Sequence, residues 1–150
     1  MQDKFIADVH LGKLAKYMRL VGIDTFYNNS YSVKQIIATA IEEGRIILSR
    51  NNSFTSLQNI PSFIVNNEDS KEQLKNVLSQ FKGDIKLQPF TRCLICNGLL
   101  EAVEKETISH LLEKNTREYY SEFWICSECS HIYWKGSHFA KMLQFLSEIK

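Results

Sequence analysis

The chain lacks several features that would assign it to a common functional class. It has no uninterrupted apolar run of membrane-spanning length, and its opening residues, MQDKFIAD, are too few and too polar for a signal segment. Its formal net charge is +1 at pH 7, so any binding of nucleic acid requires a local basic patch. We therefore expect a cytoplasmic protein that has no contact with membranes.

A glycine-rich phosphate-binding loop is also missing. The first apolar run is followed by His10-Leu11-Gly12, which matches neither a dinucleotide fingerprint nor a P-loop. This argues against a nucleotide-binding Rossmann enzyme. Hydrophobic residues make up 44% of the chain, which excludes extended disorder, and 150 residues are enough for one domain plus a small module.

The first segment with a clear pattern joins an apolar run to an amphipathic helix. Phe5 and Ile6 begin the run, and Asp8 ends it. Apolar residues then recur at steps of three and four, while basic residues fall on a different, exposed face: Lys13, Lys16 and Arg19. Ligands of open α/β sheets bind at the carboxyl end of such strands, so Asp8 is a candidate site residue. The alternative is that Asp8 only caps the turn or helix.

The same alternation of strand and helix continues to about residue 82. Further strands are predicted at 24–27, 45–49 and 62–65, and further helices at 33–43, about 53–57 and 70–81. Ser32 and Ser70 are the predicted helix caps, and Asp24, at the amino end of its strand, is interpreted as structural. The pattern predicts an α/β fold with a parallel sheet and helices on both faces. We expect this domain to span residues 1–85, and a second module with a final helix at 139–149 to occupy residues 86–150.

All four cysteines lie in the second part of the chain, in two C-x2-C pairs. The pairs are Cys93 with Cys96 and Cys126 with Cys129, separated by 29 residues. Two such turns brought together form a closed tetrahedral site of four thiolates, which is a structural zinc site. Disulfides and unliganded thiols are the alternatives, and a cytoplasmic location disfavours the disulfides. Gly98 is expected to serve the tight backbone of the first pair.

Two stretches together resemble one known family. The first stretch is FIADVHLGKLAKYMRLVGIDT with EEGRIILSRN, and the second is TRCLICNGLL with FWICSECSHIYWKGSHFAKM. They resemble the nuclease part and the zinc ribbon of the Mut-seven C-terminal RNase domain family. That resemblance implies a PIN-like nuclease fold followed by a ribbon. It also implies cleavage of RNA by carboxylates that hold Mg²⁺ or Mn²⁺ at the carboxyl ends of the strands.

The sequence departs from the family's acidic pattern. Asp8 matches the aspartate of the first strand, but the threonine-arginine-aspartate of the third strand is here Ser49-Arg50-Asn51. No acid follows the second strand, and Asp69 is a remaining acid at the same edge. The first hypothesis is a metal-dependent ribonuclease with Asp8, Asn51 and Asp69 as catalytic residues. Its phosphate contacts would come from the exposed basic residues, namely Lys13, Lys16, Arg19 and Arg50, unless these form an ordinary solvated face.

The alternative hypothesis is an inactive module on the same fold that binds RNA or a protein. The missing acids favour it. Aromatic residues near the second cysteine pair could stack on bases or could form the ribbon's small core: Phe123, Trp124, Tyr133 and Trp134.

Overall fold

The computed structural model describes residues 3–54, 59–83 and 85–149. Contacts within the chain divide it into two compact units, residues 1–97 and residues 98–150. The first cysteine pair lies in the first of these units. None of the helices in the described ranges is both long and apolar enough to span a membrane.

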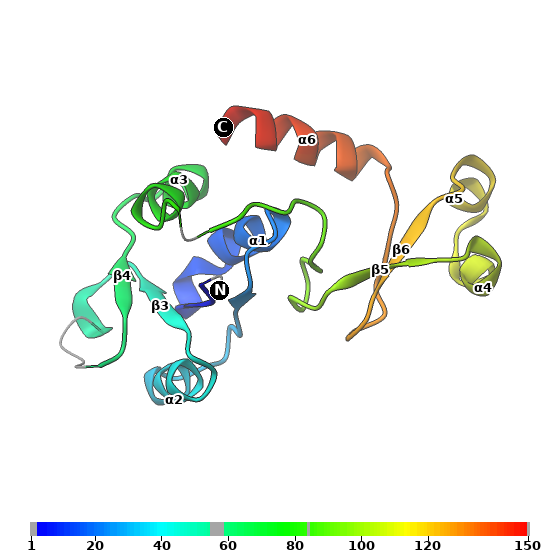
Figure 1. Ribbon diagram of the computed structural model, residues 1–150. Coiled ribbons are helices and arrows are strands. Elements are labelled where there is room, and N and C mark those ends of the chain that lie inside the picture. Colours follow the sequence, from blue (N-terminus) through cyan, green and yellow to red (C-terminus); the bar gives the residue numbers. More distant parts are fainter. Residues whose placement is uncertain (1–2, 55–58, 84, 150) are drawn as a thin grey trace. The chain divides into compact units, whose positions relative to one another are not determined.

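The first unit is built on a parallel sheet of four strands in the order β2-β1-β3-β4 (Figure 1). The strands are β1 (Phe5–Ala7), β2 (Thr25–Phe26), β3 (Ile46–Ser49) and β4 (Ser62–Ile64). Helices α1 (Gly12–Leu20) and α2 (Val33–Glu43) connect the first three strands along the chain, and α3 (Ser70–Gln80) follows β4. Short 3-10 turns lie at Val9–Leu11 and Asn52–Phe54. The predicted parallel α/β fold is confirmed. The predicted helix at about 53–57 falls partly outside the described residues.

The alternation of side chains along each strand supplies one core layer to each face of the sheet. Ile6 and Ile47 are paired in register and pack with Ile36 and Ala40 of α2. On the opposite face, the Phe5 ring lies 5.1 Å from the ring of Phe81, directly after α3. Adjacent residues of a strand point to opposite faces, so helices are needed on both (Figure 1).

Local chemistry explains where the helices begin and end. Ser32 caps α2 in a reciprocal arrangement with Gln35, and Gly44 ends it in the left-handed conformation, at φ 67°. The prediction that Ser70 caps α3 is wrong, because Ser70 is the first residue of that helix. The cap is Asp69, whose carboxylate accepts the Glu72 N–H, because a side chain must precede the helix to reach these N–H groups.

The second unit is a ribbon of three antiparallel strands followed by a helix. The strands are β5 (Leu100–Val103), β6 (Phe123–Cys126) and β7 (Ile132–Tyr133), in that order across the sheet. Short helices α4 (Lys105–Ile108) and α5 (Lys114–Tyr119), with a 3-10 turn at Ser109–Leu111 between them, separate β5 from β6, and α6 (Ser137–Ile149) ends the chain. The strand β5 was not predicted, because its residues LEAV show no strict alternation of apolar and polar side chains.

Candidate functional site

Asp8 lies where β1 ends, at the carboxyl edge of the parallel sheet. Its side chain is buried, with the residue 7% exposed. One carboxylate oxygen accepts the Val9 N–H at 2.7 Å, so Asp8 does cap the 3-10 turn that follows. The other oxygen accepts the Ser49 hydroxyl at 3.1 Å. The capping role therefore does not exclude a ligand role, because a carboxylate can accept about four hydrogen bonds or ligand contacts.

Ser49 is the residue of this site that the sequence alone did not identify. It is the last residue of β3 and is 2% exposed. The parallel register pairs Ala7 with Leu48, which brings Ser49 beside Asp8. The Ser49 oxygen also accepts the backbone N–H of Asn51 at 3.2 Å. This contact follows from the register of β1 against β3. It could not be predicted, because apolar runs alone do not determine how two strands are aligned.

The other two predicted catalytic residues have local roles at the same edge of the sheet. Asn51 is exposed and follows β3 by two residues. Asp69 is exposed and begins α3 as its cap. Both follow strands that are neighbours in the sheet, β3 and β4, so they belong to the edge at which Asp8 lies.

No dense acidic cluster accompanies Asp8 among residues 3–54, 59–83 and 85–149. Within these ranges the four cysteines are the only group of three or more His, Cys, Asp or Glu side chains whose ligand atoms converge enough for one ion. A Mg²⁺ ion retains several waters and often takes only one or two carboxylates from the protein, with substrate phosphates completing its shell. Among the described residues at this edge, the chain offers one buried carboxylate, that of Asp8.

The predicted basic residues divide into two groups. Lys13 and Lys16 on α1 are exposed, as is Arg50, whose guanidinium lies 3.9 Å from the Glu68 carboxylate. The prediction that Arg19 shares their exposed face is wrong, because Arg19 is 5% exposed. Its guanidinium donates to the carbonyl oxygens of Thr25, Leu94 and Ile95 at 2.9, 3.0 and 3.1 Å. These contacts give Arg19 a structural role.

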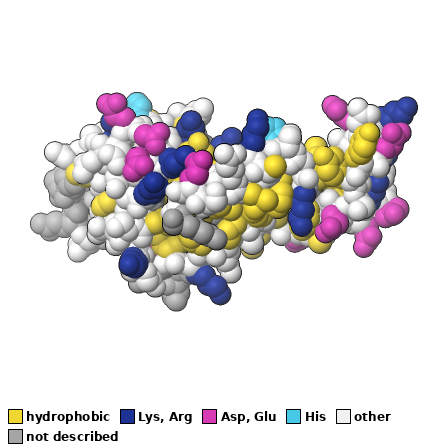
Figure 2. All heavy atoms as spheres, turned by 90° about the horizontal axis from the view of Figure 1, so that it is seen from above, with side chains coloured by type: hydrophobic (Ala, Val, Ile, Leu, Met, Phe, Trp, Pro, Cys, Tyr) yellow, Lys and Arg dark blue, Asp and Glu magenta, His cyan; other side chains and the backbone are white. Residues whose placement is uncertain are grey.

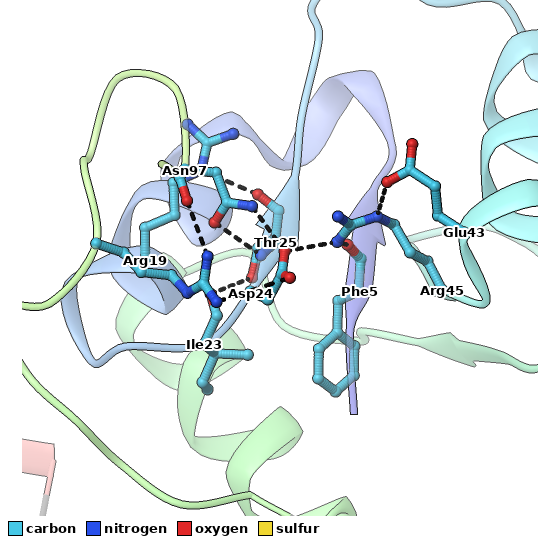
Figure 3. A network of polar contacts seen from close by, with 9 residues as sticks. Phe5, Arg19, Ile23, Asp24, Thr25, Glu43, Arg45 and Asn97 are labelled. Atoms are coloured by element: carbon cyan, nitrogen blue, oxygen red, sulfur yellow. Dashed lines mark hydrogen bonds and ion pairs between the residues drawn. The ribbon is translucent and has the colours of Figure 1, made fainter. Parts of the chain in front are cut away.

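Asp24 is the centre of a polar network at the amino edge of the sheet, opposite Asp8 (Figure 3). One carboxylate oxygen accepts from Arg45 and from the Asn97 side chain, both at 2.7 Å, and Arg92 lies 3.7 Å from the other oxygen. Burial raises the pKa of Asp24, but the hydrogen bonds from Arg45 and Asn97 and the charges of the two arginines outweigh burial and hold that pKa below its ordinary value. The interpretation of Asp24 as structural agrees with these contacts.

The four cysteines form a cluster of the size that a tetrahedral ion requires. Their sulfur atoms all lie within 4.8 Å of one another, and Cys93 and Cys126 are buried. A zinc ion bonded to four thiolates at about 2.3 Å would hold the sulfur atoms about 3.8 Å apart. Four soft thiolate donors in this arrangement suit zinc, and four protein ligands leave no open position for catalysis. The cluster can therefore hold a metal such as zinc.

The two cysteine pairs adopt the same turn. The carbonyl of the first cysteine in each pair accepts an N–H from four residues on, Asn97 to Cys93 at 2.9 Å and Ser130 to Cys126 at 3.1 Å. Both of these residues have left-handed backbones, with φ 75° at Asn97 and 65° at Ser130. The tight backbone expected at Gly98 thus falls one residue earlier. Gly98 is needed for space, because an added Cβ would lie 2.8 Å from the Cys126 sulfur and 2.6 Å from Glu128.

Comparison with known families decides the assignment. The Mut7-C RNAse domain family matches residues 3–146, which is nearly the whole chain. The chain belongs to this family. No match is found among curated proteins. Membership of the Mut7-C RNAse domain family supports a nuclease-like function and suggests an interaction with RNA.

The aromatic residues of the ribbon in this Mut7-C chain differ in their burial: Phe123 is buried, whereas Trp134 is exposed. Phe123 is 2% exposed and forms a small core with Ile108 and Leu112. The Trp134 ring lies 6.2 Å from the Phe123 ring, and the Lys135 ammonium lies 5.6 Å from the centre of the Trp124 ring. Of the two alternatives for these residues, the core is the one that applies to Phe123.

Proposed function

We propose that this protein is a metal-dependent ribonuclease whose site is the carboxyl edge of the parallel sheet. The observation that carries the proposal is the position of Asp8 in a chain of the Mut7-C RNAse domain family: a buried carboxylate at the end of the first strand, oriented by Val9 and Ser49. Such fixed orientation is what a metal ligand requires, because hydrogen bonds to a ligating carboxylate restrict the direction of its remaining lone pairs.

A bound Mg²⁺ or Mn²⁺ ion would activate water and stabilise charge on the scissile phosphate. Asp8 would hold the ion, and Asn51 and Asp69 would support it as weaker partners from the adjacent strand ends. Asn51 carries no charge where the family pattern has an aspartate, so we expect weak binding of the ion and slow cleavage. The four cysteines would hold a structural zinc ion that takes no part in the reaction. A reducing compartment keeps such thiols available for metal, which is why we place the protein in the cytoplasm.

The distribution of charge supports an RNA contact made by the first unit. Lys13, Lys16 and Arg50 are exposed and can contact phosphates without reading sequence. The helical end of the ribbon is unsuited to this, since residues 100–122 hold six glutamates and three basic residues. On the face that Figure 2 shows, acidic side chains are interspersed with basic ones, and there is no continuous basic surface. We therefore expect weak RNA binding that falls with increasing salt.

The test is cleavage of a mixed set of single-stranded and structured RNAs in Mn²⁺, Mg²⁺ or EDTA. Asp8→Asn keeps the size of the side chain and removes the charge that holds the ion. Glu42→Gln is the matched control, because Glu42 is an exposed carboxylate on α2, whose carboxyl end leads to the opposite edge of the sheet. Metal-dependent cleavage should be lost in Asp8→Asn and retained in Glu42→Gln. Equal cleavage by both variants would refute the proposal.

The second candidate is a module that binds RNA or a protein without cleavage. It is favoured by the absence of a convergent acidic cluster among the described residues and by Asn51 at the position of an acid. RNA binding that persists in EDTA, without cleavage in either metal and with no change in Asp8→Asn, would establish this candidate in place of the enzyme.

A further inference from the structure

The first cysteine turn is attached to the parallel sheet by side chains that are not metal ligands. Two arginines and one asparagine make the attachment, and all of them lie in the first unit together with Cys93 and Cys96. Figure 3 shows two of these residues, Arg19 and Asn97, close to Asp24 and Thr25. The contacts act on both the middle and the ends of the turn. The contacts of Arg19 with Leu94 and of Asn97 with Asp24 link residues more than 70 positions apart in sequence.

The middle of the turn is held by Arg19. Its guanidinium donates to the carbonyl oxygens of Leu94 and Ile95, the two residues between the cysteines. Arg19 lies in the last turn of α1 and also donates to Thr25 in β2. The planar fork of a guanidinium suits this task, since it addresses several carbonyl oxygens with fixed geometry. The peptide groups between the cysteines are thus positioned by the sheet domain.

The ends of the turn are held by Asp24. Arg92 precedes Cys93 and lies 3.7 Å from the Asp24 carboxylate, and Asn97 follows Cys96 and donates to that carboxylate at 2.7 Å. The Asn97 side chain also accepts the Thr25 N–H at 3.0 Å. Arg92 further donates to the Asn97 carbonyl oxygen at 2.9 Å, which connects the two ends directly. Within the first unit, the turn is therefore fixed at the residues on either side of its two cysteines.

We propose that Asp24, Asn97 and Arg19 are positioning residues for the metal site, and that metal binding and the order of the sheet's amino edge are thermodynamically coupled through them. If the turn is already held in place, less conformational entropy is lost when the ion binds. By linkage, an ion that fixes the turn stabilises the contacts to α1 and β2 in return. The metal then strengthens the carboxyl end of α1, the helix that follows Asp8.

The second cysteine turn provides a matched control within the same chain. Asn97 and Ser130 occupy the same left-handed position of their respective turns. The Asn97 side chain reaches Asp24 and Thr25, whereas the Ser130 side chain is exposed. Replacement by glycine tolerates the positive φ at both positions, so Asn97→Gly and Ser130→Gly differ in the loss of these contacts and not in backbone strain.

The experiment uses full-length protein purified with zinc, with metal content measured first. Zinc release into an excess of a colorimetric chelator is then followed for the wild type, Asn97→Gly and Ser130→Gly. Loss of a supporting contact typically costs 10-fold to 100-fold in metal affinity. We expect release from Asn97→Gly to be faster by about tenfold or more, and release from Ser130→Gly to stay within about threefold of the wild type.

A second readout tests the contact between Asn97 and Thr25 itself. Hydrogen exchange of the Thr25 amide should become faster in zinc-loaded Asn97→Gly and not in Ser130→Gly, because the Asn97 side chain is the acceptor of that N–H. If Asn97→Gly does not fold, Asp24→Asn replaces it with the same expected direction of change in release. Equal release from the two glycine variants would overturn the coupling. Wild-type protein without zinc would overturn the metal site itself, independently of the ribonuclease assay.

Discussion

Removal of the charge on Asp24 should destabilise the first unit more than any single surface change. The Asp24 side chain is 21% exposed, and Arg45, its closest ionic partner at 2.7 Å, is 8% exposed. Arg45 also donates to the Phe5 carbonyl oxygen, so it is fixed at the first residue of β1. Asp24→Asn would remove the carboxylate beside Arg92 and the closer of the two carboxylates that contact Arg45, while it retains one amide oxygen as an acceptor.

The expected loss is about 2–3 kcal/mol of the free energy of unfolding at pH 7, which is the range for a hydrogen bond to a charged group that is partly buried. For a chain of this length it corresponds to a fall of roughly 5–10 °C in Tm. Glu43→Gln is the control. Its carboxylate contacts the same Arg45 at 2.8 Å but is 39% exposed, so it should cost about 0.5 kcal/mol.

The pH dependence follows from the lowered pKa of Asp24. A carboxyl whose pKa is lower in the folded state contributes stability that is fully present above the unfolded pKa of about 3.9 and is lost as the pH falls through the folded value. The difference between the wild type and Asp24→Asn should therefore be constant from about pH 5 to 8 and shrink below about pH 4.

The assay is urea unfolding of the wild type and both variants across this pH range, each set in the same buffer so that release of metal in acid affects all three. A loss in Asp24→Asn no larger than that in Glu43→Gln would refute the reasoning. If the difference in stability between the wild type and Asp24→Asn stays the same well below pH 4, the charge of Asp24 is not the source of that difference.

Two further predictions concern the backbone and the metal site. Gly22→Ala should lower the free energy of unfolding by about 2 kcal/mol or more, and lower Tm in a thermal melt. The reason is that φ is 90° there and an added Cβ would lie 2.2 Å from the Gln88 carbonyl oxygen. Gly44→Ala, at φ 67° with open space around the Cβ, is the control that measures the conformational part alone. Cys93→Ser should lower bound zinc, measured by elemental analysis, from about one ion per chain, and it should also lower the yield of soluble protein. Full zinc occupancy in Cys93→Ser would contradict the four-thiolate site.

Much of the fold could be predicted because its signals are local. Ser32 and Gly44 bound α2 through capping chemistry that involves residues within one turn. The apolar runs of β1 and β3 identify strands that are covered on both faces. The spacing within Cys93-Leu94-Ile95-Cys96 is likewise sufficient to predict a turn with two thiolates directed to one ion.

The role of Arg19 could not be predicted in this way. Helical periodicity identifies which residues share a face but does not reveal what covers that face. Residues 86–97 lie along the end of α1, with Gln88 and Phe90 donating to the carbonyl oxygens of Val21 and Leu20, and this segment buries Arg19. The contact with Leu94 depends on a separation of 75 residues, for which no local pattern exists.

The candidate catalytic edge shows the same division. The sequence by itself determined that Asp8 ends a buried strand and that the third strand is followed by Asn51 instead of an acid, because both facts concern neighbours along the chain. Only the tertiary structure decided that Ser49 orients Asp8 and that Asp24 joins the first cysteine turn to the sheet. These contacts depend on strand register and on how distant segments pack, which arise from burial of the whole core and not from any single stretch.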